Sequence, residues 1–216
     1  MKNEKKLIVK IVYYGPALSG KTTNLIRLHD IILPGGKGDL MTLETSGDRT
    51  LFFDLLPLTA GKTTGGYRII FKLFTVPGQV AHDATRKAVL SRSDGVVYVA
   101  DSQRTQSLNN AASFENLEKN AGRVGIDFDR LPLVIQYNKR DLPDIIKEEE
   151  VRRLWDNTGI PVVFGTALTG QGVLQTFRGI LQKIYQSLDN HLLLNEELKI
   201  SEADFMMVAR GRDSAF

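Results

Sequence analysis

One short segment constrains the fold more than any other: residues 15–22 read Gly-Pro-Ala-Leu-Ser-Gly-Lys-Thr. This segment fits the pattern G-x-x-x-x-G-K-[ST], and it separates an apolar run, Leu7–Tyr14, from a segment of helical period, Lys21–Ile32. In that context the glycines let backbone N–H groups turn inward around phosphate oxygens, and the helix N-terminus adds a partial positive charge. The segment therefore predicts a phosphate-binding loop between a strand and a helix.

Two side chains of this loop have predicted roles of their own. Lys21 would reach the β- and γ-phosphates, and the Thr22 hydroxyl would be a ligand of Mg²⁺. The alternative is an ordinary Gly-rich turn before a helix, although average composition rarely produces this pattern. The predicted phosphate-binding residues are Gly15, Pro16, Ala17, Leu18, Ser19, Gly20, Lys21, Thr22 and Thr23.

Apolar, β-branched runs alternate with helical segments along most of the chain, which predicts βαβ units. We expect an α/β fold with a mostly parallel six-stranded sheet and helices on both faces. The strands predicted at 51–56 and 67–76 are separated only by a Gly-rich turn and should form one antiparallel hairpin. The other predicted strands are 7–14, 95–100, 133–137 and 162–164, and the predicted helices are 21–32, 80–91, 106–124, 147–157 and 173–188.

The strand–helix pattern stops after Leu188, so we predict a domain over residues 1–188 and a C-terminal extension over residues 189–216. The extension contains an apolar cluster, Phe205–Val208. It could pack as an extra helix, act as a partner-binding segment, or be disordered.

Composition excludes several classes of protein. The 216 residues contain no cysteine, which excludes disulfides, thiolate zinc sites, a cysteine nucleophile and a cysteine-anchored lipid. With 28 Lys+Arg against 25 Asp+Glu, the charge is only +3, and neither a basic stripe nor a nucleic-acid-binding module is evident. Because no targeting segment stands out, we expect a cytoplasmic protein that binds no nucleic acid.

A second motif, Asn138-Lys139-Arg140-Asp141, follows the apolar strand predicted at 133–137 and fits the N-K-x-D pattern of guanine-nucleotide proteins. The Asp141 carboxylate can accept hydrogen bonds from the N1–H and the exocyclic amine of guanine, whereas adenine offers neither donor there. Asn138 would bind the other edge of the base, and the stem of Lys139 would cover its face. An ordinary polar turn is the alternative for these four residues alone.

A third and weaker signal is Thr166-Ala167, which follows the last predicted strand. It occupies the place of the Ser-Ala segment whose backbone contacts guanine in such proteins.

Together these motifs make the chain resemble the Ras-like small GTPases, and most closely the bacterial MglA family of motility and polarity GTPases. The resemblance covers most of residues 7–170. The segments with the closer match are 10–16, Asp48-Arg-Thr-Leu-Phe-Phe-Asp54, Thr75-Val-Pro-Gly-Gln79, Val99-Ala-Asp-Ser-Gln103 and Val134-Ile-Gln-Tyr-Asn-Lys-Arg-Asp-Leu-Pro143.

The resemblance implies a GTPase that binds GTP or GDP with Mg²⁺. Thr50, at the end of the polar stretch 35–50, would join Thr22 as a metal ligand, and the Gly78 N–H would bind the γ-phosphate. Gln79 would orient the attacking water, and Arg49 would act as an intrinsic arginine finger. A dimeric roadblock-fold activating protein (MglB-like) is the implied partner, and it would bring Arg49 and Gln79 into place. Each residue also has an ordinary structural alternative. Thr50 could cap the following strand, Gln79 could be an exposed loop residue, and Arg49 could form a salt bridge on the surface.

Two residues depart from the usual Ras-like pattern. Thr75 stands where D-x-x-G has an aspartate, which is itself the MglA pattern and predicts a less charged metal shell. Ala17 stands where glycine is usual, and its methyl group is expected to slow hydrolysis without preventing nucleotide binding. The sequence is compatible with three functions. The first is a GTPase switch in polarity or motility, and the second is a nucleotide-gated scaffold with little turnover, which Ala17 makes plausible. The third is an ATP-dependent enzyme, against which residues 138–141 argue. Because the absent cysteine excludes a prenyl anchor, recruitment to a membrane or pole should use protein partners.

Overall fold

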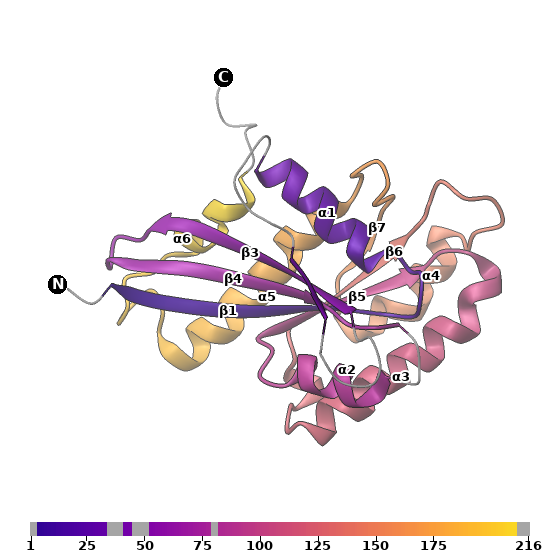
Figure 1. The fold of residues 1–216 in the computed structure, drawn as a ribbon, viewed down its shortest axis with the longest axis horizontal. Helices are drawn as coiled ribbons and strands as arrows, with labels where there is room; N and C mark the ends of the chain where they lie inside the picture. Colours follow the sequence, from indigo (N-terminus) through magenta and orange to yellow (C-terminus); the bar gives the residue numbers. More distant parts are fainter. Residues whose placement is uncertain (1–3, 34–40, 45–51, 79–81, 211–216) are drawn as a thin grey trace.

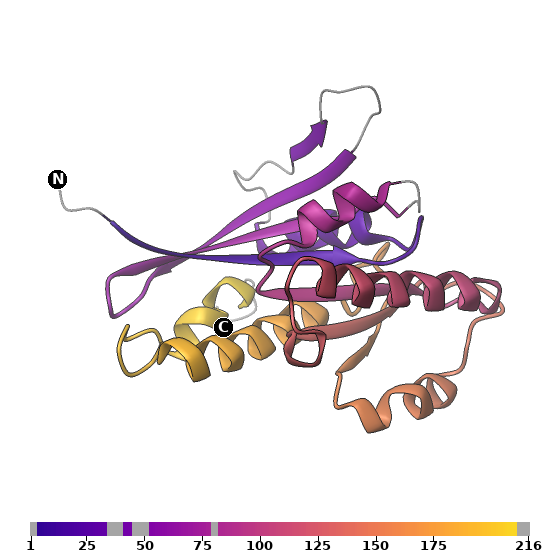
Figure 2. The same cartoon turned by 90° about the horizontal axis from the view of Figure 1, so that it is seen from below.

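The computed structural model describes residues 4–33, 41–44, 52–78 and 82–210 and has one sheet between two layers of helices (Figures 1 and 2). The strands are β1 (Lys5–Tyr14), β2 (Met41–Glu44), β3 (Phe52–Lys62), β4 (Tyr67–Thr75), β5 (Gly95–Asp101), β6 (Leu133–Asn138) and β7 (Val162–Phe164). The α-helices are α1 (Lys21–Ile32), α2 (Asp83–Leu90), α3 (Ser107–Arg123), α4 (Glu148–Trp155), α5 (Val173–Leu192) and α6 (Glu202–Met206).

The sheet has seven strands in the order β2-β3-β4-β1-β5-β6-β7. Strands β4, β1, β5, β6 and β7 pair in parallel, whereas β3 is antiparallel to both β2 and β4. The predicted α/β fold and the β3–β4 hairpin are confirmed. The sheet has one strand more than the six predicted, because β2 lies within the polar stretch 35–50, for which the sequence predicts no strand. Its apolar alternation covers only four residues, too few for a clear periodic signal.

Strand β3 also continues six residues beyond the predicted end at residue 56, to Lys62. Pro57 lies inside it, and a proline normally argues against a central strand. Here β2 pairs only with the part of β3 from Phe52 to Leu55. From Pro57 onward β3 is therefore an edge strand within the described sheet, and a missing backbone N–H is tolerated there.

The central strands are buried on both faces, which explains their continuous apolar character. Every residue of β5 and β6 is buried. On β1, Val9 and Ile11 face a core shared with α1 and α5, whereas Val12 and Tyr14 face a core shared with α2, α3 and α4. The alternation follows from the two-residue repeat of a strand.

The C-terminal segment packs on the same core as α1 and α5. Helix α5 ends at Leu192, and residues 193–210 turn back so that α6 lies beside α5 at the end of the sheet where β1 begins (Figures 1 and 2). Phe205 of α6 is fully buried, and its ring centroid lies 5.0 Å from that of Phe71 in an edge-to-face contact. The division of the chain at residue 188 stays a prediction.

Candidate nucleotide-binding site

The predicted site residues follow the carboxyl ends of parallel strands, which meet at one edge of the sheet, where α/β proteins bind their ligands. Residues 15–20 follow β1, residues 76–78 follow β4, residues 139–141 follow β6 and residues 165–167 follow β7. The parallel pairing thus brings segments that are far apart in the chain to one place.

The backbone of the phosphate loop requires glycine at two positions. Gly15 has a φ of +145°, and a Cβ added there would lie 2.2 Å from the carbonyl oxygen of Val99. Gly20 has a φ of +96°, and a Cβ added there would lie 2.2 Å from Nδ2 of Asn138. Both distances are shorter than any side chain tolerates, so this path of the loop excludes other residues.

Lys21 lies across the loop it follows. Its Nζ donates hydrogen bonds to the carbonyl oxygens of Gly15 (3.0 Å) and Pro16 (2.6 Å), and the residue is 7% exposed. Beside it, the hydroxyl oxygen of Ser19 is buried and has no hydrogen-bond partner among the described residues. The first turn of α1 carries no acidic residue that would oppose an anion. These features fit a phosphate group within the loop.

Asn138 connects three of the loops. Its Nδ2 donates to the carbonyl oxygen of Ser19 at 2.8 Å, and its Oδ1 accepts from the backbone N–H of Ala167 at 2.8 Å. The side chain is buried, at 2% exposure for the residue. The predicted phosphate-binding, base-binding and Thr166-Ala167 segments are therefore held together by one amide group.

Lys139 adopts a left-handed backbone conformation, with a φ of +65°. Its Nζ lies 2.7 Å from Oδ2 of Asp101 at the end of β5. Asp141, two residues further on, is exposed beyond the end of β6. Within the motif the Asp141 carboxylate is therefore exposed to solvent, whereas Lys139 is bound to the buried carboxylate of Asp101.

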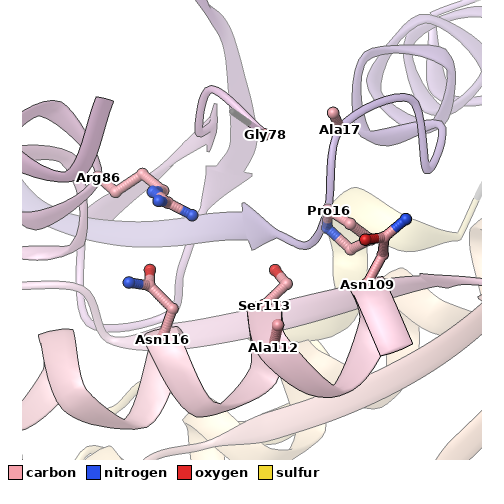
Figure 3. Close-up of a pocket in the computed structure, with 8 residues that line it drawn as sticks. All are labelled: Pro16, Ala17, Gly78, Arg86, Asn109, Ala112, Ser113 and Asn116. Atoms are coloured by element: carbon pink, nitrogen blue, oxygen red, sulfur yellow. The ribbon is translucent and has the colours of Figure 1, made fainter. Parts of the chain in front are cut away.

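The loop after β4 approaches the phosphate loop closely. A Cβ added to Gly78 would lie 2.3 Å from Cα and 2.4 Å from the nitrogen of Ala17. Beside this contact is a cavity of about 450 Å³, whose wall includes Arg86 from α2 and Ser113 from α3 (Figure 3). Gly78 therefore lies directly against the backbone of the phosphate loop.

Comparison with known proteins identifies the family. A model of the Ras family matches residues 43–186. The chain belongs to the Ras family. It is also 45% identical over 186 residues to the mutual gliding-motility protein MglA of Myxococcus xanthus (strain DK1622), covering 86% of this chain and 95% of the relative. The predicted resemblance and enzyme class are confirmed: this is an MglA-like small GTPase, a GTP hydrolase.

Three predicted residues of this MglA-like GTPase, Arg49, Thr50 and Gln79, lie outside the described residues. The structure does bring together Lys21, Gly78, Asn138 and the other predicted residues of the loops after β1, β6 and β7. Asp101 is the site residue that sequence reasoning missed. Its position directly after the strand predicted at 95–100, inside a segment that matches the family, was the available signal.

Helix α2, which follows the loop that carries Gly78, is fixed to α3 by a polar network. Asp83 accepts hydrogen bonds from Nδ2 of Asn120 (2.8 Å) and Nδ2 of Asn116 (3.1 Å). The hydrogen bond from Asn120 is the main reason that the pKa of Asp83 lies below its usual value. Arg86, one turn later, is 1% exposed. The start of α2 is thus held against α3.

Two hydroxyl groups among the described residues, those of Thr22 and Thr75, lie where a metal ligand is expected. Across the described ranges, no three His, Cys, Asp or Glu side chains lie close enough to hold a metal ion. Thr22 is exposed at the start of α1, and Thr75 is buried at the end of β4. Such a donor set fits Mg²⁺, which binds through one or two protein ligands, waters and substrate phosphates.

The lengths and apolar character of the helices also bear on whether the described chain could cross a membrane. No helix within the part of the chain that the structure describes has both the length and the apolar character needed to cross a bilayer.

Proposed function

We propose that this MglA-like GTPase is a nucleotide-dependent switch in bacterial cell polarity or motility. It binds GTP or GDP with Mg²⁺ and hydrolyses GTP to GDP and phosphate. The observation that most supports nucleotide binding is that Asn138 donates a hydrogen bond to the Ser19 carbonyl oxygen and accepts one from the Ala167 N–H, because these bonds hold the predicted phosphate-binding loop beside the predicted base-binding motif. The cellular role rests on the similarity to the mutual gliding-motility protein MglA of Myxococcus xanthus.

In the proposed complex the guanine base lies over Lys139, with Asp141 accepting hydrogen bonds from N1–H and the exocyclic amine. The backbone N–H groups near Thr166 and Ala167 would contact the base oxygen. ATP would leave the Asp141 carboxylate desolvated and without hydrogen-bond donors, which costs about 1–3 kcal/mol or more for a charged group.

In the proposed reaction, water attacks the γ-phosphorus, the bond to the β–γ bridging oxygen breaks, and GDP leaves with that oxygen. Gln79 orients the water, Lys21 and the Gly78 N–H contact the γ-phosphate, and Arg49 stabilises charge on the transferring group. Mg²⁺ bound through Thr22 and Thr50 would supply positive charge next to the phosphate oxygens.

The proposed partner is a dimeric roadblock-fold protein, MglB-like, that places Arg49 and Gln79. An arginine finger contributes about 10³–10⁵ to the hydrolysis rate, so without the partner turnover should be slow. Protein partners of this kind would also recruit the GTPase to a pole or membrane.

The second candidate function is a nucleotide-gated scaffold with little or no turnover. Ala17 favours it, because Gly78 already packs against the backbone of this residue, and the added methyl group would occupy space beside a bound γ-phosphate. In that case the GTP-bound form would persist even with an activator.

One experiment separates these functions. The protein is purified under mild conditions with Mg²⁺, its bound nucleotide is identified by ion-exchange chromatography, and GTP hydrolysis is measured with and without a candidate roadblock-fold partner. A switch carries guanine nucleotide and turns over faster with the partner. Bound GTP that is stable with the partner indicates the scaffold, and bound adenine nucleotide would overturn the base assignment.

A further inference from the structure

A second cavity, of about 410 Å³, lies between α3 and α4, and we refer to it as the α3–α4 pocket. None of the phosphate-loop or base-motif residues line it. Its wall contains four aromatic residues, Tyr98, Phe114, Tyr137 and Trp155. Its volume lies within the range of about 300–1,000 Å³ that ligand pockets usually have.

The aromatic wall is rigidly held by contacts among its own rings. The ring centroids of Tyr98 and Phe114 are 5.1 Å apart, and those of Phe114 and Trp155 are also 5.1 Å apart, both in edge-to-face arrangements. Trp155 Nε1 donates to the Tyr137 hydroxyl at 3.3 Å, and the Tyr98 hydroxyl donates to the carbonyl oxygen of Asn110 at 2.5 Å. Because these polar groups already have hydrogen-bond partners, the surface that the wall presents to a ligand is mainly aromatic.

Three carboxylates line the pocket, and two of them are already paired with lysines. Asp101 is paired with Lys139, and Glu115 is paired with Lys119, whose Nζ lies 2.6 Å from Glu115 Oε1. Glu118 is exposed and forms no ion pair with any described residue, and none of the described residues that line the pocket is basic. The nearby guanidinium of Arg104 is held by two hydrogen bonds to Glu150, at 2.7 and 3.1 Å. Aromatic faces and carboxylates both attract cations. Their combination distinguishes this pocket from a purely apolar one.

The rim next to the aromatic wall is apolar. Leu154 of α4 lines the pocket and is 61% exposed. A large exposed leucine beside a preformed pocket is suited to a protein partner, which can cover it with an apolar side chain of its own. A small free cation would leave Leu154 uncovered.

We propose that the α3–α4 pocket binds an arginine or lysine side chain of a protein partner, next to an apolar residue of the same partner that covers Leu154. The alkyl stem lies on the aromatic wall, and the cationic group faces Glu118, the lining carboxylate without an ion pair among the described residues. The pocket shares Asp101 with the predicted base site, but the inference does not depend on the proposed function.

The chain has a built-in reporter for this proposal, because Trp155 is its only tryptophan. The full-length protein is titrated with the dipeptide N-acetyl-leucyl-arginine amide while tryptophan fluorescence is recorded. The matched control ligand contains citrulline, whose side chain has nearly the same shape without the charge. We expect saturable binding that is about threefold to tenfold tighter for the arginine dipeptide. Equal binding of the two dipeptides, or no saturable change with either, would overturn the proposal.

Two variants and one further ligand sharpen the test. Glu118→Gln should weaken the arginine dipeptide severalfold and leave the citrulline dipeptide unchanged, whereas Glu197→Gln, an exposed site in the C-terminal segment, should change neither. Leu154→Ala should weaken the dipeptide but not free n-butylguanidinium. If free n-butylguanidinium binds wild type as tightly as the dipeptide, the pocket takes a small organic cation, and the proposed protein partner is wrong.

Discussion

The Nζ atom of Lys139 lies 2.7 Å from Oδ2 of Asp101, so the predicted base-binding motif is joined to the end of β5. The second oxygen of Asp101, Oδ1, accepts a hydrogen bond from the backbone N–H of Gln103 at 3.0 Å, and the residue is only 4% exposed. A carboxylate fixed in this way determines where the ammonium group of Lys139 lies. The stem of Lys139 is in turn the group expected to cover the guanine base.

We therefore expect Asp101→Asn to weaken nucleotide binding. The amide keeps the shape but loses the charge that holds Lys139, and hydrogen bonds to charged groups contribute about 1.5–3 kcal/mol. A loss of this order corresponds to dissociation of GDP that is about tenfold to a hundredfold faster, with the preference for guanine over adenine retained. The rate at which a fluorescent GDP analogue dissociates measures the effect. The control is Asp129→Asn, because Asp129 is exposed and lies in the segment that follows α3. An unchanged dissociation rate would show that Lys139 is positioned without Asp101.

Gly78→Ala should separate hydrolysis from binding. The added Cβ would lie 2.3 Å from Cα of Ala17, so the loop after β4 could not approach the phosphate loop as it does in the structure. We expect single-turnover GTP hydrolysis to fall by at least about tenfold, as removal of one donor to a reacting phosphate does, while GDP affinity changes little. Gly122→Ala in α3 is the control, because its Cβ would meet nothing within 4 Å. Equal losses in both variants would point to a general effect on stability.

Ala17→Gly tests the departure from the usual phosphate loop. Ala17 is exposed on the loop, and its backbone is the surface against which Gly78 packs. Removal of the methyl group should raise the single-turnover hydrolysis rate and leave GTP affinity unchanged, because Lys21 and the loop glycines keep their contacts. Hydrolysis by the two proteins is compared with and without an activating partner. Equal rates in both conditions would exclude a role for this methyl group.

Much of the site could be predicted because its signals are local. A G-x-x-x-x-G-K-T segment between a strand and a helix specifies both a backbone path and a ligand class, and N-K-x-D after a buried strand specifies a base. The structure places both where expected. It also explains why Gly20 is required, since the space for its Cβ is taken by Asn138.

What could not be predicted depends on contacts between distant segments. The pairing that makes Met41–Glu44 a strand comes from β3, and the four residues alone carry too weak a signal. The short reach of β2, which leaves Pro57 on an edge of the sheet, cannot be seen in the sequence. The contact between Asp101 and Lys139 joins the ends of two strands, and no spacing rule connects them.

The last prediction concerns the base. Asp141 is exposed at the end of β6 and would face the N1–H and exocyclic amine of guanine. Asp141→Asn places an amide where two donors arrive, and its N–H₂ would oppose the guanine amine. Xanthine has a carbonyl oxygen in place of that amine, so the variant should prefer xanthine.

We expect the affinity of Asp141→Asn for GDP to fall by at least about a hundredfold, as loss of a matched buried hydrogen-bonding group commonly causes. Affinity for xanthosine diphosphate should rise, whereas wild type should show the reverse order. Competition against a fluorescent nucleotide measures all four affinities. If the variant lost affinity for both nucleotides alike, Asp141 would support the loop rather than read the base.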